Sequence, residues 1–190
     1  MEIPIRADVE CADGPGGEVT HVIVHAATKK VTQIVVKEAK SPHAERVVPF
    51  RFVAEATAKE IRLRCSRQEL TRMQPFIRIE VVETAWSQDG RMPTDVKKVK
   101  RLNIAEDELA MDTGTQVRAT DGNVGRMDEV MVDPANGFIT HLVMREGHVW
   151  APKEATVPVS EVERLGDKAV YLRKDRAAVA ALPAVPARRR

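Results

Sequence analysis

Hydrophobic and polar positions alternate in short runs along most of this chain, and turn residues separate the runs. In the second half, valines and methionines mark a strand of partial alternation over 124–132, and 138–144 is a second run rich in strand formers. The other strands predicted in this half are short and lie around 148–150, 155–159 and 169–172. Such spacing is typical of a small barrel or sandwich, so the pattern predicts a mainly β fold.

An internal repeat relates the two halves. Residues 9–38 align without gaps on residues 117–146 at an offset of 108, and ten of the 30 pairs are identical. After one inserted residue the match resumes at an offset of 109, where Val48 meets Val157. Apolar and turn positions coincide while most polar positions differ. This predicts two copies of one fold, each with its own core.

Turn residues recur at equivalent places in the repeat. Asp-Gly is a tight-turn pair, and a glycine three residues later supplies backbone freedom. In the second copy a Pro and an Asn-Gly pair between strands predict a hairpin loop. The structural turn residues are therefore Asp13, Gly14, Gly17, Asp121, Gly122, Gly125, Asp133, Pro134 and Gly137.

Each copy is predicted to end in a short helix. Ser66 and Asp175 occupy equivalent positions and are good N-caps, and Glu69 has capping-box spacing from Ser66. Apolar residues at helical spacing give each helix one buried edge. These edges are Leu70 with Met73 and Val179 with Leu182.

The connector between the copies, residues 77–110, is too apolar for a flexible tether. Residues 76–82 look extended, 87–90 form a turn, and 105–111 are expected to make one turn of helix with Asn103 as its cap. We expect this connector to pack along one or both copies.

The second copy carries four motifs that resemble one known family. They are G-T-x-V-x-x-x-D-G-x-x-G at 114–125, D-P-x-x-G at 133–137, I-T-H-L-V-x-R-E at 139–146 and V-P-x-S-x-V at 157–162. With them, residues 111–183 resemble a PRC-barrel domain, the small β-barrel of the photosynthetic reaction-centre H subunit. That barrel also occurs at the C-terminal end of a bacterial ribosome-maturation factor. In the first copy His25 to Lys30 replace D-P-x-x-G, which predicts a different turn type.

The resemblance implies a tandem arrangement. It comprises two small PRC-type β-barrels over 1–76 and 111–183, each ending in a short α-helix. A partly extended connector over 77–110 joins them, and a basic tail follows over 184–190. The resemblance implies a binding or assembly module and not an enzyme. No catalytic residue carries over, because the family's matching positions are turn and core residues. The resemblance does not imply photosynthesis. It does not imply a quinone site either, because the chain lacks the membrane helix that anchors the reaction-centre subunit.

The charge balance argues against a nucleic-acid partner. The chain has 30 Lys and Arg against 28 Asp and Glu, and residues 111–187 carry a net charge of −2 once Arg188 to Arg190 are set aside. A nucleic-acid-binding fold usually carries a basic surplus. The longest apolar runs have four or five residues, so no membrane span is expected. Two cysteines without metal spacing, and no signal peptide, predict a cytoplasmic protein.

Candidate chemistry is sparse. His141, Glu146 and His148 could ligate a metal only if they converged, but strand alternation turns 141 away from 146 and 148. Asp121 and Asp133 are better explained as turn formers than as members of a carboxylate cluster. We expect no catalytic residue, no cofactor and no metal site.

Two sets of residues are candidates for contact with a partner. Lys97, Lys98, Lys100 and Arg101 form the densest internal basic run and could meet RNA phosphates or an acidic partner. Aromatic side chains often anchor interfaces, and this chain has few. The candidate interface residues are Trp86, Phe138 and Trp150.

These observations favour a non-catalytic interaction or assembly module that self-associates, with a homodimer expected. One alternative is an RNA- or ribosome-associated maturation factor. Another is the binding of a small ligand or metal between the two barrels. The sequence names neither the protein partner nor the biological process.

Overall fold

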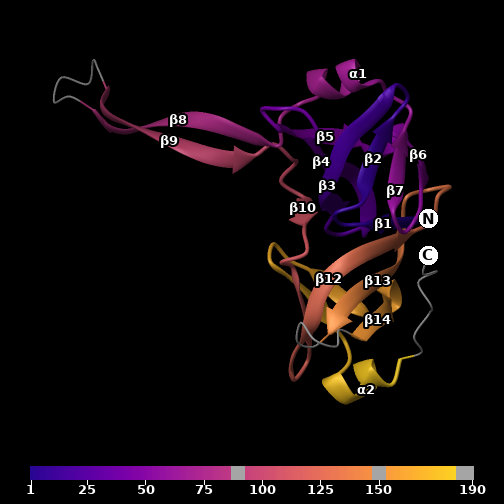
Figure 1. Ribbon diagram of the computed structural model, residues 1–190. Coiled ribbons are helices and arrows are strands. Elements are labelled where there is room, and N and C mark those ends of the chain that lie inside the picture. The colour runs from indigo at the N-terminus through magenta and orange to yellow at the C-terminus, as the bar shows by residue number, and fades with distance from the viewer. Residues whose placement is uncertain (87–92, 147–152, 183–190) are drawn as a thin grey trace.

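The computed structural model describes residues 1–86, 93–146 and 153–182 (Figure 1). Strands make up 58% of the structure and helical residues 11%, which confirms the mainly β prediction. No helix in the described part of the chain is both long and apolar enough to span a lipid bilayer. The strand predicted around 148–150, the turn at 87–90 and the basic tail lie outside the described residues.

The first copy forms one seven-stranded sheet. Its continuous path is β5-β4-β3-β2-β7-β6, in which only the β2–β7 pair is parallel. The strands of this path are β2 (Asp8–Cys11), β3 (Gly14–His25), β4 (Lys30–Glu38), β5 (Glu45–Pro49), β6 (Val53–Ala56) and β7 (Glu60–Leu63). The seventh strand, β10 (Glu108–Met111), pairs with β3 and comes from the far end of the connector.

The second copy repeats this order as β14-β13-β12-β11-β16-β15, again with one parallel pair, β11–β16. Its strands are β11 (Gln116–Ala119), β12 (Gly122–Val132), β13 (Ile139–Glu146), β14 (Lys153–Pro158), β15 (Val162–Leu165) and β16 (Ala169–Leu172). Its seventh strand is β1 (Glu2–Pro4), from the start of the chain, which pairs with β12. Short 3-10 helices, η1 (Phe50–Phe52) and η2 (Val159–Glu161), lie at equivalent places.

The two copies therefore exchange their leading strands. Ile3 in β1 lies opposite Val130, and Met111 in β10 lies opposite Val22. Both pairs obey the repeat offset of 108, so the exchange is symmetric. The helix expected over 105–111 is wrong, because Glu108 to Met111 extend along the edge of β3 and gain a strand's backbone hydrogen bonds there.

Most buried apolar residues of both copies form one continuous core, and a smaller separate cluster in the first copy consists of Ile23, Val35, Val47 and Phe76. The largest cluster includes Ile3 and Val22 as well as Met111 and Val130, all at most 1% exposed. The expectation of a separate core for each copy is therefore wrong, because each exchanged strand carries its apolar side chains into the other copy's interior. Among the described residues neither sheet closes into a barrel, since the two end strands of each path do not pair with each other.

Both predicted helices are present. The first, α1 (Arg67–Arg72), begins after Ser66 with a complete capping box to Glu69, and α2 (Arg176–Ala180) begins after Asp175, whose side chain accepts from the Ala178 N–H. Leu70 and Val179 are buried as the helical spacing predicts. Asp13 and Asp121 add a second link. They accept from the backbone N–H of Arg67 at 2.7 Å and of Arg176 at 2.8 Å.

The hairpin loops of the two copies share one conformation. In the second copy, the Gly137 N–H donates to the Asp133 carbonyl at 2.8 Å, and Gly137 has a φ of +77°. In the first copy, the Lys29 N–H donates to the His25 carbonyl at 2.9 Å, and Lys29 has a φ of +55°. The expected difference in turn type is thus wrong. The backbone keeps its path although a lysine occupies a left-handed position that favours glycine.

Candidate functional site

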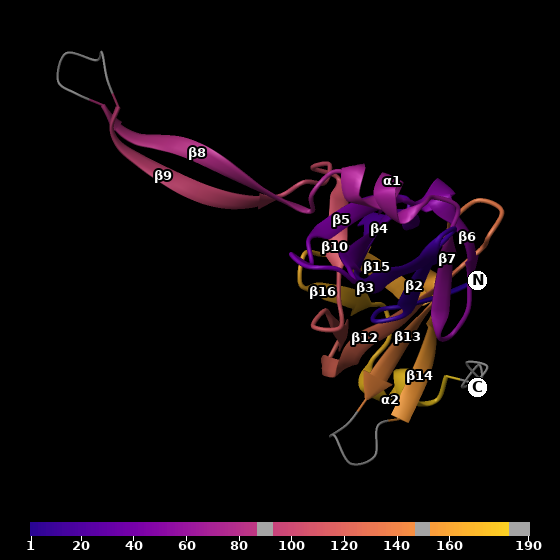
Figure 2. The ribbon, with the colours of Figure 1, turned by 45° about the horizontal axis from the view of Figure 1, so that its top comes forward.

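The connector forms an arm that stands away from both sheets (Figure 1; Figure 2). This arm consists of β8 (Ile77–Trp86) and β9 (Pro93–Leu102), which pair antiparallel as a separate two-stranded sheet. The expectation that the connector packs along the copies is wrong for this part. The two arm strands form their backbone hydrogen bonds with each other, so neither pairs with the sheets of the two copies.

One face of the arm carries an exposed apolar stripe. Successive side chains of a strand point to opposite faces, so Ile77, Ile79 and Val81 share one face, together with Leu102 opposite Ile77. Their exposed fractions are 41%, 63%, 61% and 46%. Single exposed apolar residues are ordinary on protein surfaces, but a contiguous apolar patch usually marks an interaction site.

The predicted basic run lies along β9, and strand alternation divides it between the two faces. Lys98 lies opposite Val81 and Lys100 opposite Ile79, so these two lysines border the apolar stripe. Lys97 and Arg101 lie on the other face. All four side chains are exposed. The four basic residues therefore lie on one strand, but only Lys98 and Lys100 share a face with the apolar stripe.

The other face of the arm is held by ion pairs. Arg78 Nη2 lies 2.8 Å from Glu80 Oε1, and Arg101 Nε contacts Glu80 Oε2 from the neighbouring strand. Exposed ion pairs of this kind contribute little to stability, about 0.2–1 kcal/mol each. On this face the carboxylate of Glu80 is therefore shared by two guanidinium groups.

The base of the arm is anchored in the first copy. Phe76 is 2% exposed, and its ring centroid lies 4.7 Å from that of His21. Burial lowers the pKa of His21, so the ring facing Phe76 favours its neutral form. The Phe76 N–H donates to the Glu45 carbonyl at 2.9 Å, and the Asn103 N–H donates to the Phe76 carbonyl at 2.7 Å. These contacts join the end of β9 and the start of β8 to the edge of β5.

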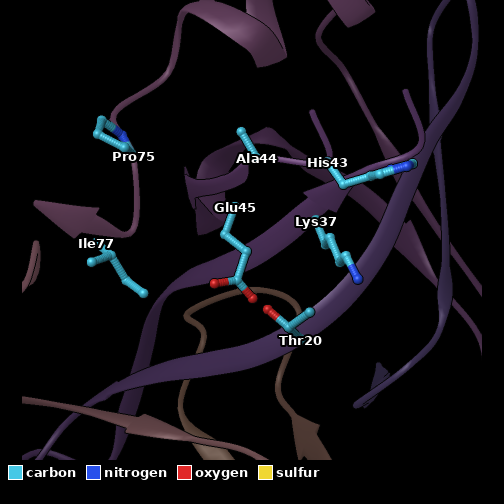
Figure 3. A pocket seen from close by; sticks show the side chains of 7 residues that line it. All are labelled: Thr20, Lys37, His43, Ala44, Glu45, Pro75 and Ile77. Carbon is cyan, nitrogen blue, oxygen red and sulfur yellow. The ribbon is translucent and has the colours of Figure 1, made fainter. Parts of the chain in front are cut away.

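A hollow of about 480 Å³, the root pocket, opens beside this anchor (Figure 3). Figure 3 shows the Glu45 carboxylate directed toward Thr20, with Lys37 on the same side and Ile77 across the hollow. Ile77 is also the first residue of the apolar stripe, so the pocket and the stripe adjoin. Two further hollows are described, and all three are lined by residues of the first copy and the connector.

The three aromatic candidates have different positions. Trp86 is the last residue of β8, and its side chain is outside the described part. Trp150 is outside the described residues altogether. Phe138 is 44% exposed and forms a β-bridge with Lys30, so it lies where the hairpins of the two copies meet.

The remaining candidate chemistry does not converge in the described part of the chain. No group of three or more His, Cys, Asp or Glu side chains that could hold a metal lies there, and His148 falls outside it. Cys11 and Cys65 are both buried, and burial raises the pKa of Cys11 to about 12. The candidate site is therefore a binding surface that consists of a free strand edge, the apolar stripe and the lysines beside it.

The apolar stripe is the part of this site that sequence reasoning missed. The connector was expected to pack along the copies because it is too apolar for a flexible tether. Arg78 and Glu80 alternate with the apolar positions, which indicates that the strand has one apolar face but not whether that face is covered. No protein-family model matches the chain, and no curated protein matches it in sequence.

Proposed function

We propose that this chain is a non-catalytic interaction or assembly module of the PRC-barrel type, and that the arm is its docking element. The observation that carries this proposal is the exposed stripe of Ile77, Ile79 and Val81 on a strand that pairs only with β9 within the described part of the chain. Such an edge presents unpaired N–H and C=O groups beside apolar side chains, which is the surface that strand addition uses.

The shared core also supports this proposal, because it distinguishes the rigid part of the molecule from the arm. The exchanged strands β1 and β10 place the apolar faces of both copies in one interior, whereas none of the arm's described side chains belongs to that interior. The body thus acts as a scaffold that holds the arm through Phe76 and Asn103. Interaction surfaces are commonly presented in this way, on elements positioned by a rigid framework.

The experiment is site-specific photo-crosslinking in cells that express the full chain. A photoreactive amino acid is placed at Val81 on the stripe, and at Arg118, an exposed residue of β11, as the matched control. We expect Val81 to give protein adducts of defined mass that Arg118 does not give. Identical adduct patterns at both positions would contradict docking through the arm.

A second candidate function is RNA or ribosome association, favoured by the exposed side chains of Lys97, Lys98, Lys100 and Arg101 on β9. Two observations weigh against it. Arg101 is engaged by Glu80, and no aromatic residue interrupts the basic run to stack on bases. Co-sedimentation with ribosomal subunits at low and high salt tests it, because phosphate contacts bind most strongly at low salt.

A further inference from the structure

The free edge of β8 is self-complementary. Residues 77 to 81 are Ile, Arg, Ile, Glu and Val, so a basic and an acidic residue flank a central isoleucine symmetrically. We propose that β8 of one molecule pairs antiparallel with β8 of a second copy, about a twofold axis at Ile79. This inference rests on the proposed function, because it names the partner that the arm would dock.

In this register the twofold axis repeats each contact once, so every pair occurs twice except the pair on the axis. Ile79 faces Ile79 of the second copy, Ile77 faces Val81, and Arg78 faces Glu80. The apolar stripes of the two arms then join on one face of a four-stranded sheet, in the order β9-β8-β8-β9. Two Arg–Glu pairs form on the other face. Opposite charges directly across an antiparallel pair are favourable, and like charges there are unfavourable.

Neighbouring registers are disfavoured by the same residues. A slip of one residue sets the apolar face of one copy beside the charged face of the other. A slip of two residues places Glu80 against Glu80, or Arg78 against Arg78. Pairing through β9 is disfavoured too, because a twofold at Val99 would set Lys98 against Lys100 and Lys97 against Arg101. Charge complementarity therefore selects both the strand and its register.

Figures 1 and 2 show β8 standing clear of both sheets beyond its base. Ile79 lies near that base, and β8 continues to Trp86, so each arm extends roughly 23 Å past the axis at 3.3 Å per residue. A five-residue ladder alone is smaller than the ~1,600 Å² of a typical stable interface. We therefore expect a weak dimer whose population depends on protein concentration.

Cysteine cross-linking tests the register in the full chain. An Ile79→Cys residue would meet its own symmetry mate, whereas a Val81→Cys residue would lie opposite Ile77, about 13 Å from its mate and beyond the reach of a disulfide. Under mild oxidation we expect a covalent dimer from Ile79→Cys and none from Val81→Cys or the wild type. The native Cys11 and Cys65 are buried, so the wild-type chain measures the background of cross-linking. Equal cross-linking at 79 and 81 would overturn the register.

Charge exchange tests the pairing without relying on a single variant's folding. By light scattering, we expect Arg78→Glu to weaken the dimer at least about tenfold, because both charge pairs become repulsive. The double variant Arg78→Glu with Glu80→Arg should recover the wild-type affinity to within about threefold, since it restores both pairs. Failure of the double variant to recover, or a wild-type chain that stays monomeric, would overturn self-pairing.

The two proposals fail differently. If the chain is monomeric but Val81 still captures a different protein that Arg118 does not capture, self-pairing is wrong and the docking function of the arm stands. If the chain instead co-sediments with ribosomal subunits in a salt-sensitive way and Val81 captures no protein, both proposals are wrong. A second copy captured at Val81, together with the Ile79→Cys dimer, supports both.

Discussion

Lys30 and Phe138 occupy equivalent positions in the two copies, and the backbone pairs them with each other. The Val31 N–H donates to the Gly137 carbonyl at 2.9 Å, and the Ile139 N–H donates to the Lys29 carbonyl at 3.0 Å. The Lys30 ammonium lies 5.7 Å from the centre of the Phe138 ring. This bridge marks the pseudo-twofold axis of the molecule, because a residue can pair with its own equivalent only on that axis.

The loop that holds this bridge should be sensitive to substitution at Gly137. Its φ of +77° disfavours any Cβ, and a Cβ there would lie 3.3 Å from the Val31 carbonyl oxygen and from the Phe50 ring. We expect Gly137→Ala to lower the free energy of unfolding by about 1–2 kcal/mol. Urea denaturation measures this, with Ala135→Ser in the exposed part of the same loop as the control. An unchanged midpoint for Gly137→Ala would contradict the strained geometry.

Truncation of the exchanged strands should destabilise the whole chain and not one half. Ile3 and Met111 are 0% and 1% exposed and belong to the shared core. We expect Ile3→Ala and Met111→Ala each to cost about 2–5 kcal/mol. Because the core is continuous, unfolding should remain one transition by circular dichroism and by fluorescence. Arg118→Ala on the surface is the control, and a variant that unfolds in two separate steps would refute the shared core.

Asp13 and Asp121, which accept hydrogen bonds from the first residue of each helix, should make stability fall in acid. Backbone hydrogen bonds from Arg67 and Arg176 lower the pKa of Asp13 and of Asp121, respectively, below the ordinary value of 3.8. A lowered folded-state pKa stabilises the fold above the unfolded value, and this contribution disappears as the pH falls below about 4. In Asp13→Asn with Asp121→Asn, we expect a smaller loss of thermal stability between neutral pH and acid than in the wild type. Parallel pH profiles would show that these carboxylates do not contribute.

The two thiols should be unreactive in the folded protein. Burial raises the pKa of Cys11 to about 12 and also raises that of Cys65, so the reactive thiolate is scarce at neutral pH. We expect a thiol reagent such as dithionitrobenzoate to label neither residue in buffer and both in denaturant. Rapid labelling of the native chain would contradict the buried positions of these side chains.

The local structure of each copy could be predicted from the sequence. The spacing of Ser66 from Glu69 indicated a capping box, and the apolar edge of Leu70 indicated which helix face is buried. Both are encoded within one turn of helix. The equivalence of the copies was equally visible, because the repeat offset links turn residues that set the strand lengths.

The arrangement of the copies could not be predicted in the same way. Nothing in the residues of β1 or β10 says whose sheet they join, since the edges of β3 and β12 present equivalent backbone groups to both. The exposure of Ile79 and Val81 was missed for a related reason. Alternation reports that one face of a strand is apolar, but it does not report whether anything within the same chain covers that face.

The strand exchange also affects the way the protein can assemble. If a copy were a separate chain and gave its leading strand to another molecule, it would need the leading strand of a second chain to complete its own sheet. That exchange would depend on protein concentration. Here the neighbour is covalently attached, so the missing strand is always present at an effective concentration on the order of millimolar. The internal pairing is thereby saturated at any dilution. Among the described elements, the arm lies outside this pairing, so the docking proposed for it would still depend on the concentration of the partner.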